Sequence, residues 1–206
     1  MIRNIIFDMG NVLINFRPNW ILDSFDVSNA DDRELLKNEV FKSDEWLKTD
    51  SGELTLDEAI ESMMKRLPKR LEPTVINLVK KWWESAPLTN GMEELITTLK
   101  NNGYRIYVLS NTNLDYHSFK KVIPVTKLAD GEFISAEHKL LKPTPEIYFA
   151  FLEKFALDES ECFFVDDLED NIKGAKSVGI DGHIFDGDVL KLKEKLQSVG
   201  VDTFDK

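Results

Sequence analysis

Cysteine is nearly absent from this chain of 206 residues, since Cys162 is the only one. No disulfide can therefore form within the chain, and such a composition is typical of a reducing compartment. Cys162 opens the apolar run Cys162–Val165, where it is most simply a small side chain in a buried strand. We therefore predict a cytoplasmic protein.

Long apolar stretches and an excess of basic residues are also missing. The apolar N-terminus ends at Asp8, which is too soon for a signal peptide, and no stretch approaches the roughly 20 apolar residues of a membrane span. The 26 Lys and Arg are outnumbered by 37 Asp and Glu, which gives a net charge of −11. Such a chain repels nucleic acid and anionic membranes, so we expect neither as a partner. A phosphorylated ligand would be repelled as well, unless a cation or a local lysine offset the charge.

What the chain does contain is an alternation of apolar runs and helical patterns. Apolar residues make up 42% of it, which allows a sizeable core. Buried strands are predicted at 5–7, 105–109 and 162–165, with a weaker one around 182–185. Helical spacing of apolar residues is found at 91–101, 146–155 and 171–178. This alternation predicts an α/β fold with a doubly wound parallel sheet, in which ligands bind at the carboxyl ends of the strands.

The long segment between the first two strands has a different character. Residues 15–88 have a helical pattern, most clearly at 57–67 and 74–84. Three of their four tryptophans, Trp46, Trp82 and Trp83, are expected to pack between helices rather than to form a ligand platform. A chain of this length accommodates one α/β domain and a modest insert. We therefore predict a core domain of residues 1–14 and 89–206 and a small inserted α-helical cap domain of residues 15–88.

Acidic residues follow two of the predicted strands. Asp8 follows the first, and Asp166 and Asp167 follow the third. Taken singly, Asp8 is an ordinary loop carboxylate, and the acids from Asp166 onward fit the start of a helix. Carboxylates that converge on one sheet edge repel each other unless a cation lies among them, and Mg²⁺ suits such oxygen ligands. A cation would also screen a carboxylate nucleophile that attacks an anionic phosphate.

Two other segments supply groups that suit a phosphate. Ser110 and Asn111 end the second strand, where a hydroxyl and backbone amides can hold phosphate oxygens, although a helix N-cap explains them equally well. Lys142 stands in a loop before a helix. A lone lysine is usually exposed, but a site with several carboxylates needs a fixed positive charge to hold both the nucleophile and a phosphate.

Four segments, in this order, resemble the four motifs of the haloacid dehalogenase (HAD) superfamily, and together they span nearly the whole chain. They are Phe7–Leu13, Leu109–Asn111, Lys142–Tyr148 and Phe164–Asp167, the last followed by Asn171 and Gly174. The first motif, Asp-x-Gly-Asn-Val, resembles a sub-group with a small helical cap that includes sugar-phosphate phosphatases. The resemblance implies a Rossmann-like core and Mg²⁺-dependent hydrolysis of a small phosphorylated metabolite through an aspartyl-phosphate intermediate.

The resemblance also implies roles for individual residues. Asp8 corresponds to the nucleophile, and its carboxylate also binds Mg²⁺. The carbonyl of Gly10 and the carboxylate of Asp167 correspond to further metal ligands, with Asp166 beside them as a direct or water-mediated one. The residues that correspond to phosphate contacts are Ser110, Asn111 and Lys142, of which Lys142 also takes part in catalysis.

Gly10 departs from the usual phosphatase motif, which has an acid two residues after the nucleophile. Glycine supplies a carbonyl but no proton, so a weakly basic leaving group is favoured, and a sugar 1-phosphate is the leading substrate. Other proton donors are Asp50 and Glu53 of the cap segment and His138. We expect the cap acids to lie in a solvent-exposed turn and His138 to lie at the surface.

Two other functions compete with a phosphatase. A metal-free dehalogenase also lacks the second acid of the first motif, but it has no need of the Asp166–Asp167 pair. A catalytically weak binding or regulatory protein would explain Gly10, but the retention of Asp8, Lys142 and Asp167 argues against it. The sequence leaves the substrate and the oligomeric state open.

Overall fold

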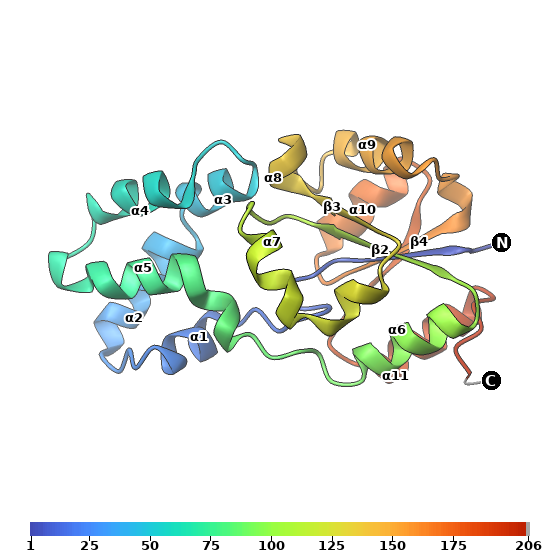
Figure 1. Ribbon diagram of the computed structural model, residues 1–206, viewed down its shortest axis with the longest axis horizontal. Helices are drawn as coiled ribbons and strands as arrows, with labels where there is room; N and C mark the ends of the chain where they lie inside the picture. The colour runs from blue at the N-terminus through green and yellow to red at the C-terminus, as the bar shows by residue number, and fades with distance from the viewer. Residues whose placement is uncertain (205–206) are drawn as a thin grey trace.

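The computed structural model describes residues 1–204 and contains a five-stranded, fully parallel sheet with helices on both faces (Figure 1). The strand order is β3-β2-β1-β4-β5, so the first strand of the chain lies at the centre. The strands are β1 (Asn4–Phe7), β2 (Arg105–Ser110), β3 (Gly131–Ile134), β4 (Cys162–Asp166) and β5 (Asp181–Ile184). The predicted doubly wound α/β fold is confirmed.

The register of the central strands brings their carboxyl ends to one level. Phe7, at the end of β1, is paired with Val108 of β2 and Val165 of β4. The residues that follow are Asp8 and Asp166, and the Asp8 N–H donates to the Val165 carbonyl at 2.9 Å. Because parallel strands share one direction, the polar residues that follow them meet at a single edge of the sheet.

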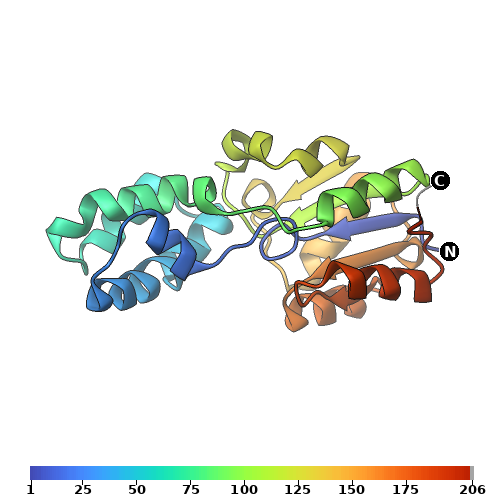
Figure 2. The same ribbon diagram turned by 90° about the horizontal axis from the view of Figure 1, so that it is seen from below.

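Two layers of helices cover the sheet. Side chains alternate between the faces along a strand, so Ile5 and Phe7 pack into one apolar cluster and Ile6 into the other. The first cluster includes residues of α6 (Met92–Asn101) and α11 (Val189–Ser198), and the second includes residues of α9 (Pro145–Phe155) and α10 (Glu169–Ser177). In Figure 2, drawn from below, α6 in green and α11 in red lie in front of the strands.

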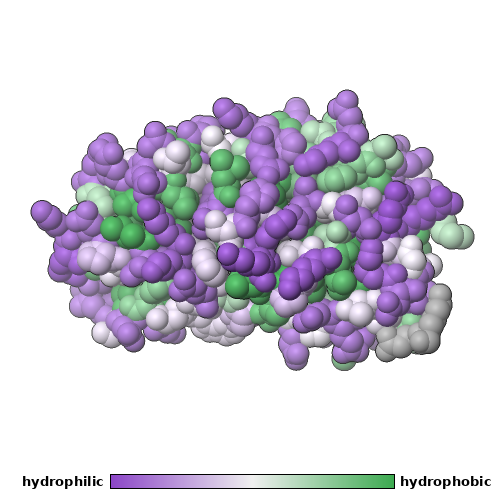
Figure 3. Space-filling view, viewed as in Figure 1, coloured by the Kyte–Doolittle hydropathy of each residue, from purple (hydrophilic) through white to green (hydrophobic). Residues whose placement is uncertain are grey.

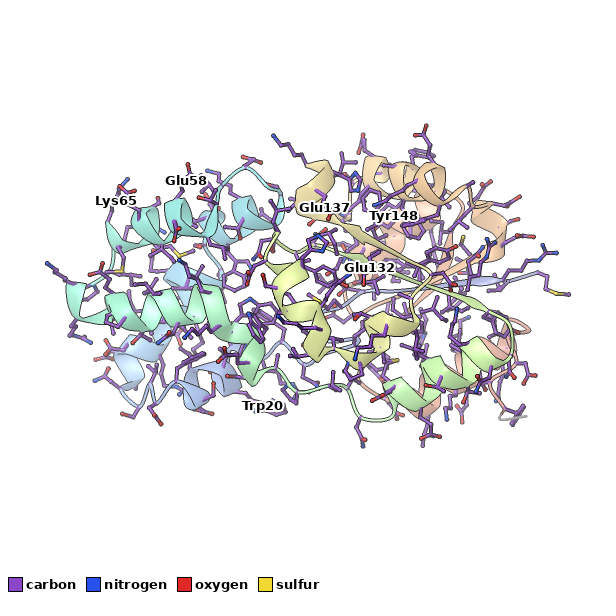
Figure 4. The ribbon with its side chains drawn as sticks, in the orientation of Figure 1. Trp20, Glu58, Lys65, Glu132, Glu137 and Tyr148 are labelled. Carbon is purple, nitrogen blue, oxygen red and sulfur yellow. The ribbon has the colours of Figure 1, made fainter. Side chains whose placement is uncertain are left out.

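The helices between β1 and α6 gather at one end of the molecule (Figure 1). They are α1 (Pro18–Ser24), α2 (Ala30–Leu36), α3 (Asp44–Asp50), α4 (Leu56–Met64) and α5 (Glu72–Lys81), with a π-helical turn at Lys37–Phe41 and 3₁₀ turns at Lys69–Leu71 and Trp82–Ser85. Glu58 of α4 and Lys65 just beyond it point outward, into solvent (Figure 4). Below, "cap" denotes this group of helices.

Two chain segments that lie side by side connect the cap to the sheet. The Asn15 N–H donates to the Pro87 carbonyl at 2.8 Å, and the Thr89 N–H donates to the Leu13 carbonyl at 2.9 Å. One apolar cluster continues from the cap into the core, because it contains residues of α5 as well as residues of β1. The cap therefore rests on the same edge of the sheet that carries Asp8.

Short elements complete the fold between β2 and β4. They are α7 (Tyr116–Phe119), the 3₁₀ turns Lys120–Val122 and Pro124–Leu128, α8 (Ser135–His138) and the 3₁₀ turn Glu159–Glu161. None of the described helices is long and apolar enough to cross a membrane. The face drawn in Figure 3 is mostly hydrophilic, with apolar residues in small groups.

The structure differs from the sequence-based expectation in a few elements. The edge strand β3 was not expected, since only Phe133 and Ile134 of its four residues are large and apolar. The helix expected over 57–67 ends at Met64, because a proline follows Leu67 and disfavours helical backbone in the residue before it. The helix expected over 74–84 ends at Lys81 and continues as a 3₁₀ turn.

Candidate active site

A buried lysine joins two carboxylates at the carboxyl edge of the sheet. The Lys142 Nζ lies 2.7 Å from Asp8 Oδ1 and 2.7 Å from Asp166 Oδ2, and it donates a third hydrogen bond to the Leu109 carbonyl at 3.0 Å. An ammonium group has three donors, so all of them are used. The side chains of Lys142 and Asp166 are 1% and 0% exposed. One positive charge thus neutralises half of a buried acidic pair.

Asn111, which follows β2, binds the backbone of Lys142 through its side chain. The Asn111 side chain donates to the Lys142 carbonyl at 3.0 Å and accepts from the Lys142 N–H at 2.9 Å. The side-chain amide of Asn111 is therefore engaged with the lysine loop, and the residue lines the same cavity as Asp8. Ser110 is 1% exposed and lines the same cavity as Asp8.

Two asparagines that sequence reasoning missed hold the carboxylates of Asp166 and Asp167. The Asn171 Nδ2 donates to both carboxylate oxygens of Asp166, at 2.9 and 3.0 Å. The Asn11 Nδ2 donates to Asp167 Oδ2 at 3.0 Å, and Asn11 has a left-handed φ of 54°. Asn11 lies within the first motif and Asn171 beside the last, so the motifs themselves contained the signal.

Three carboxylates lie close enough together to share a cation. Asp8, Asp166 and Asp167 each offer an oxygen, and these oxygens lie within 4.8 Å of one another. The Asp166 oxygens already accept hydrogen bonds from Lys142 and Asn171, whereas Asp167 accepts one from Asn11. Carboxylate oxygens in this number suit Mg²⁺, which keeps several of its waters. The donor set therefore fits the metal that the sequence predicts.

A cavity of about 220 Å³ lies between this cluster and the cap. It is smaller than the roughly 300–1,000 Å³ of sites for drug-sized ligands, so it suits a small substrate. On the cap side it is lined by Phe16, Trp46, Asp50 and Trp82. The tryptophans pack against other rings as expected, with Trp82 5.0 Å from Phe16 and 6.3 Å from Trp46 between ring centroids. Two of them nevertheless also face the ligand space.

A larger open groove of about 670 Å³ adjoins this cavity. It shares Asn11, Phe16 and Asp167 with the cavity and extends along α1. Its outer part holds Arg17, whose guanidinium lies 4.4 Å from the centroid of the exposed Trp20 ring. Trp20 is labelled at the edge of the cap in Figure 4. Neither Asp8 nor Lys142 lines the groove, so the smaller cavity is the candidate active site.

The three proton donors named from the sequence lie in different places. Asp50 lines the cavity, so the expectation that it lies in a solvent-exposed turn is wrong. The turn folds inward because the cap packs on the sheet edge. Glu53 accepts a hydrogen bond from the Ser51 hydroxyl at 3.0 Å and lines a separate cavity. His138 stacks on Phe133 with 3.9 Å between the ring centroids and does not line the cavity.

The electrostatics of the cavity favour protonated carboxyl groups when no cation is bound. Burial raises the pKa of Asp8 to about 7, because its effect and that of the Asp166 charge outweigh the attraction of Lys142. Burial also raises the pKa of Asp167, and burial together with the charge of Asp8 raises that of Asp50. For Lys142, burial lowers the pKa, but the two neighbouring carboxylates reverse this and the net pKa is raised.

These shifts predict how pH and a divalent cation act on stability. A carboxyl group whose pKa is raised on folding stabilises the folded state below its ordinary pKa, and this contribution is lost as the pH rises through about 7. We expect the melting temperature without Mg²⁺ to fall from about pH 5 to about pH 8. Mg²⁺ competes with protons for the carboxylates, so the rise in melting temperature that it causes should be larger at about pH 8. An equal rise at both pH values, with NaCl of matched ionic strength as the control, would contradict this.

Comparison with known proteins supports the same chemistry. A sesquiterpene phosphatase from Aspergillus oryzae is 28% identical over 199 residues, which cover 95% of each chain. A D-ribitol-5-phosphate phosphatase from Bacteroides thetaiotaomicron is 24% identical over 189 residues, covering 88% of this chain and 90% of the relative.

Solved structures share the fold. A HAD family enzyme from Bacteroides thetaiotaomicron, in complex with magnesium and inorganic phosphate, is 25% identical with a TM-score of 0.69, covering 89% of this chain and 93% of that one. An L-2-haloacid dehalogenase from Xanthobacter autotrophicus has the same fold at 16% identity, with a TM-score of 0.68 over 97% of this chain and 84% of that one. The family model for haloacid dehalogenase-like hydrolases matches residues 2–179, and the chain therefore belongs to this family.

Proposed function

We propose that this protein is a Mg²⁺-dependent phosphatase that transfers the phosphoryl group of a small organic phosphate to Asp8 and then to water. The observation that carries the proposal is the buried Lys142, shared at 2.7 Å by Asp8 and Asp166, with Asp167 beside them. The two phosphatases and the magnesium and phosphate complex among the similar proteins support the same class of reaction.

The residues around the cavity have different roles in the proposed reaction. The Asp8 carboxylate attacks phosphorus, and Lys142 holds that carboxylate in place while its positive charge offsets the charge of the phosphate. The Ser110 hydroxyl and the Asn111 backbone contact phosphate oxygens at the end of β2. The lysine loop depends on Asn111 for its position, since the two residues exchange two hydrogen bonds.

The carboxylates of Asp8 and Asp167 and the carbonyl of Gly10 would hold the metal, and Asp166 would reach it through a water. Asp166 is assigned the indirect place because its oxygens already accept hydrogen bonds from Lys142 and Asn171. When bound, Mg²⁺ screens the charge of the nucleophile and polarises a phosphoryl oxygen. The helices of residues 15–88 would act as a cap domain over the core of residues 1–14 and 89–206, enclosing the small substrate.

The lack of a side-chain acid at Gly10 affects which leaving groups the substrate can carry. If no other group donated a proton, the leaving oxygen would depart most easily as a weak base, and a sugar 1-phosphate is the metabolite of this kind that we propose. The cavity of about 220 Å³ is compatible with a substrate of this size.

Removal of the metal tests the proposed function. We expect full loss of phosphatase activity in excess chelator and its recovery with Mg²⁺, whereas a metal-free dehalogenase would keep its activity. Asp167→Ala should raise the Mg²⁺ concentration needed for half-maximal activity by at least about tenfold, the lower end of what altered metal-site partners cost. Asp170→Ala is the matched control, since this exposed acid of α10 pairs with Lys173 and lies outside the cavity. Phosphatase activity that survives the chelator would overturn the proposal.

A further inference from the structure

The core domain offers no acid where the phosphatase motif normally has one, although it has room for it. A Cβ on Gly10 would lie 3.8 Å from Asp8 Oδ2, in ordinary contact, and the backbone there is not left-handed. Four residues that line the cavity carry a titratable side chain: Asp8, Lys142 and Asp167 from the core, and Asp50 from the cap. The first three are engaged with one another or with Asn11, so Asp50 is the group left to act on the far side of a substrate.

Contacts with the core fix the position of Asp50 at the cavity that Asp8 also lines. It is the last residue of α3, and its carbonyl accepts a hydrogen bond from the Ser135 hydroxyl at 2.6 Å. The same hydroxyl accepts from the Thr112 N–H at 2.8 Å, next to the end of β2. Ser135 thus ties the cap to the loop that follows β2.

The turn after Asp50 is in close contact with the core. Gly52 has a φ of 71°, and a Cβ there would lie 2.4 Å from the Ala136 carbonyl oxygen. Only glycine permits both this backbone conformation and this approach. Among residues 1–204, no other group donates a hydrogen bond to the Asp50 carboxyl group. This carboxyl group lines the cavity, and the negative charge of Asp8 acts on it. The carboxyl is therefore held in place through its backbone and is available to a substrate.

We propose that Asp50 is the general acid and base of the reaction, supplied by the cap in place of the acid that Gly10 lacks. The assignment rests on the proposed phosphatase function. As the Asp8 carboxylate bonds to phosphorus and the bond from phosphorus to the leaving oxygen breaks, the Asp50 carboxyl gives its proton to that oxygen. In the second step of the reaction, the hydrolysis of the aspartyl-phosphate, Asp50 takes a proton from water while the water oxygen bonds to phosphorus and the bond between Asp8 and phosphorus breaks.

A proton donor on the cap widens the class of substrates. An alkoxide is a poor leaving group unless it is protonated, so a chain with only Gly10 at this place would be confined to weakly basic leaving groups. With Asp50 as the acid, phosphate esters of primary alcohols, such as those of sugars and polyols, become substrates as well. A sugar 1-phosphate, which Gly10 by itself favours, is then one class of substrate among several.

The test compares two leaving groups in the Asp50→Asn variant. kcat/KM reports the steps up to formation of the aspartyl-phosphate, so it isolates the proton transfer to the leaving oxygen. We expect kcat/KM for glycerol 3-phosphate, an alkyl ester, to fall by roughly 10²–10⁴-fold, the range typical of a lost general acid. For 4-nitrophenyl phosphate, whose leaving group is a weak base, the loss should be far smaller. Glu53→Gln, the nearby acid outside the cavity, should change neither.

The outcomes separate this inference from the proposed function. An equal loss for both esters would show a merely structural role for Asp50, and no loss for the alkyl ester would show another donor. Either result overturns the inference while Mg²⁺-dependent turnover of the aryl ester leaves the phosphatase function standing. If the wild-type protein hydrolyses neither ester with Mg²⁺, the proposed function fails and the assignment of Asp50 falls with it.

A second variant tests the placement of the acid. Gly10→Asp, made in the Asp50→Asn background, returns a carboxyl group to the cavity where there is room for it. We expect kcat/KM for the alkyl ester to be at least about tenfold higher in the double variant than in Asp50→Asn, since a positioned acid contributes roughly 10²–10⁴-fold. A structural defect at Asp50 would not be repaired in this way. If kcat/KM for the alkyl ester does not recover in the double variant, the inference is overturned.

Discussion

Asp8→Asn should abolish turnover while the protein stays folded. An amide does not attack phosphorus and is a poor ligand for Mg²⁺, so covalent catalysis and metal placement fail together. We expect kcat to fall by at least on the order of 10³-fold. Folding should survive because the Asn oxygen still accepts the hydrogen bond that Lys142 now gives to Asp8 Oδ1 at 2.7 Å.

Stability and trapping measurements separate this result from simple unfolding. Asn removes a carboxylate whose pKa is raised to about 7 by burial, so the melting temperature at about pH 8 without Mg²⁺ should equal or exceed that of the wild type. Rapid quenching with labelled substrate should trap a phosphorylated protein in the wild type and none in the variant. A variant that keeps more than a few per cent of the activity would show that Asp8 is not the nucleophile.

Lys142→Met should cost both activity and stability. Methionine has an unbranched side chain that fills much of the same space, but it leaves Asp8 and Asp166 buried without a counter-charge. Breaking a buried ion pair by removing one partner typically costs about 3–5 kcal/mol. We expect a loss of this order in the free energy of unfolding at about pH 8 without Mg²⁺. Activity should fall to near the background rate, since the nucleophile loses the group that holds it.

The pH dependence of this loss identifies its cause. Without Lys142, the pKa of Asp8 lies further above its ordinary value in the folded state, so the penalty grows as the pH rises and shrinks as this carboxyl group becomes protonated. Urea unfolding at about pH 5 and pH 8 measures it. Lys139→Met is the control, because Lys139 is exposed and a surface substitution usually stays within about 0.5 kcal/mol. A loss that is the same at both pH values would point to packing rather than charge.

The sequence was sufficient for the catalytic edge of the sheet. Asp8 and Asp166 are predictable because each follows a short apolar run, and parallel strands bring such residues to one edge. Lys142 follows from charge, since converging carboxylates need a cation. The edge strand β3 escaped prediction because half of its residues are not large apolar ones, and its pairing with β2 comes from tertiary context. The cap boundaries at 15–88 and the roles of the site residues stay predictions.

Local patterns decided by themselves the fold class, the family and the order of the motifs, because periodicity and motif spacing are properties of neighbouring residues. Only the tertiary structure decided which partners these residues have. Lys142 meets Asp8 across 134 residues of chain, and Ser135 meets the Asp50 carbonyl across 85. Such contacts depend on how the cap packs on the sheet, which no local pattern encodes. For that reason, Asp50, which looked exposed in the sequence, lines the cavity that Asp8 also lines.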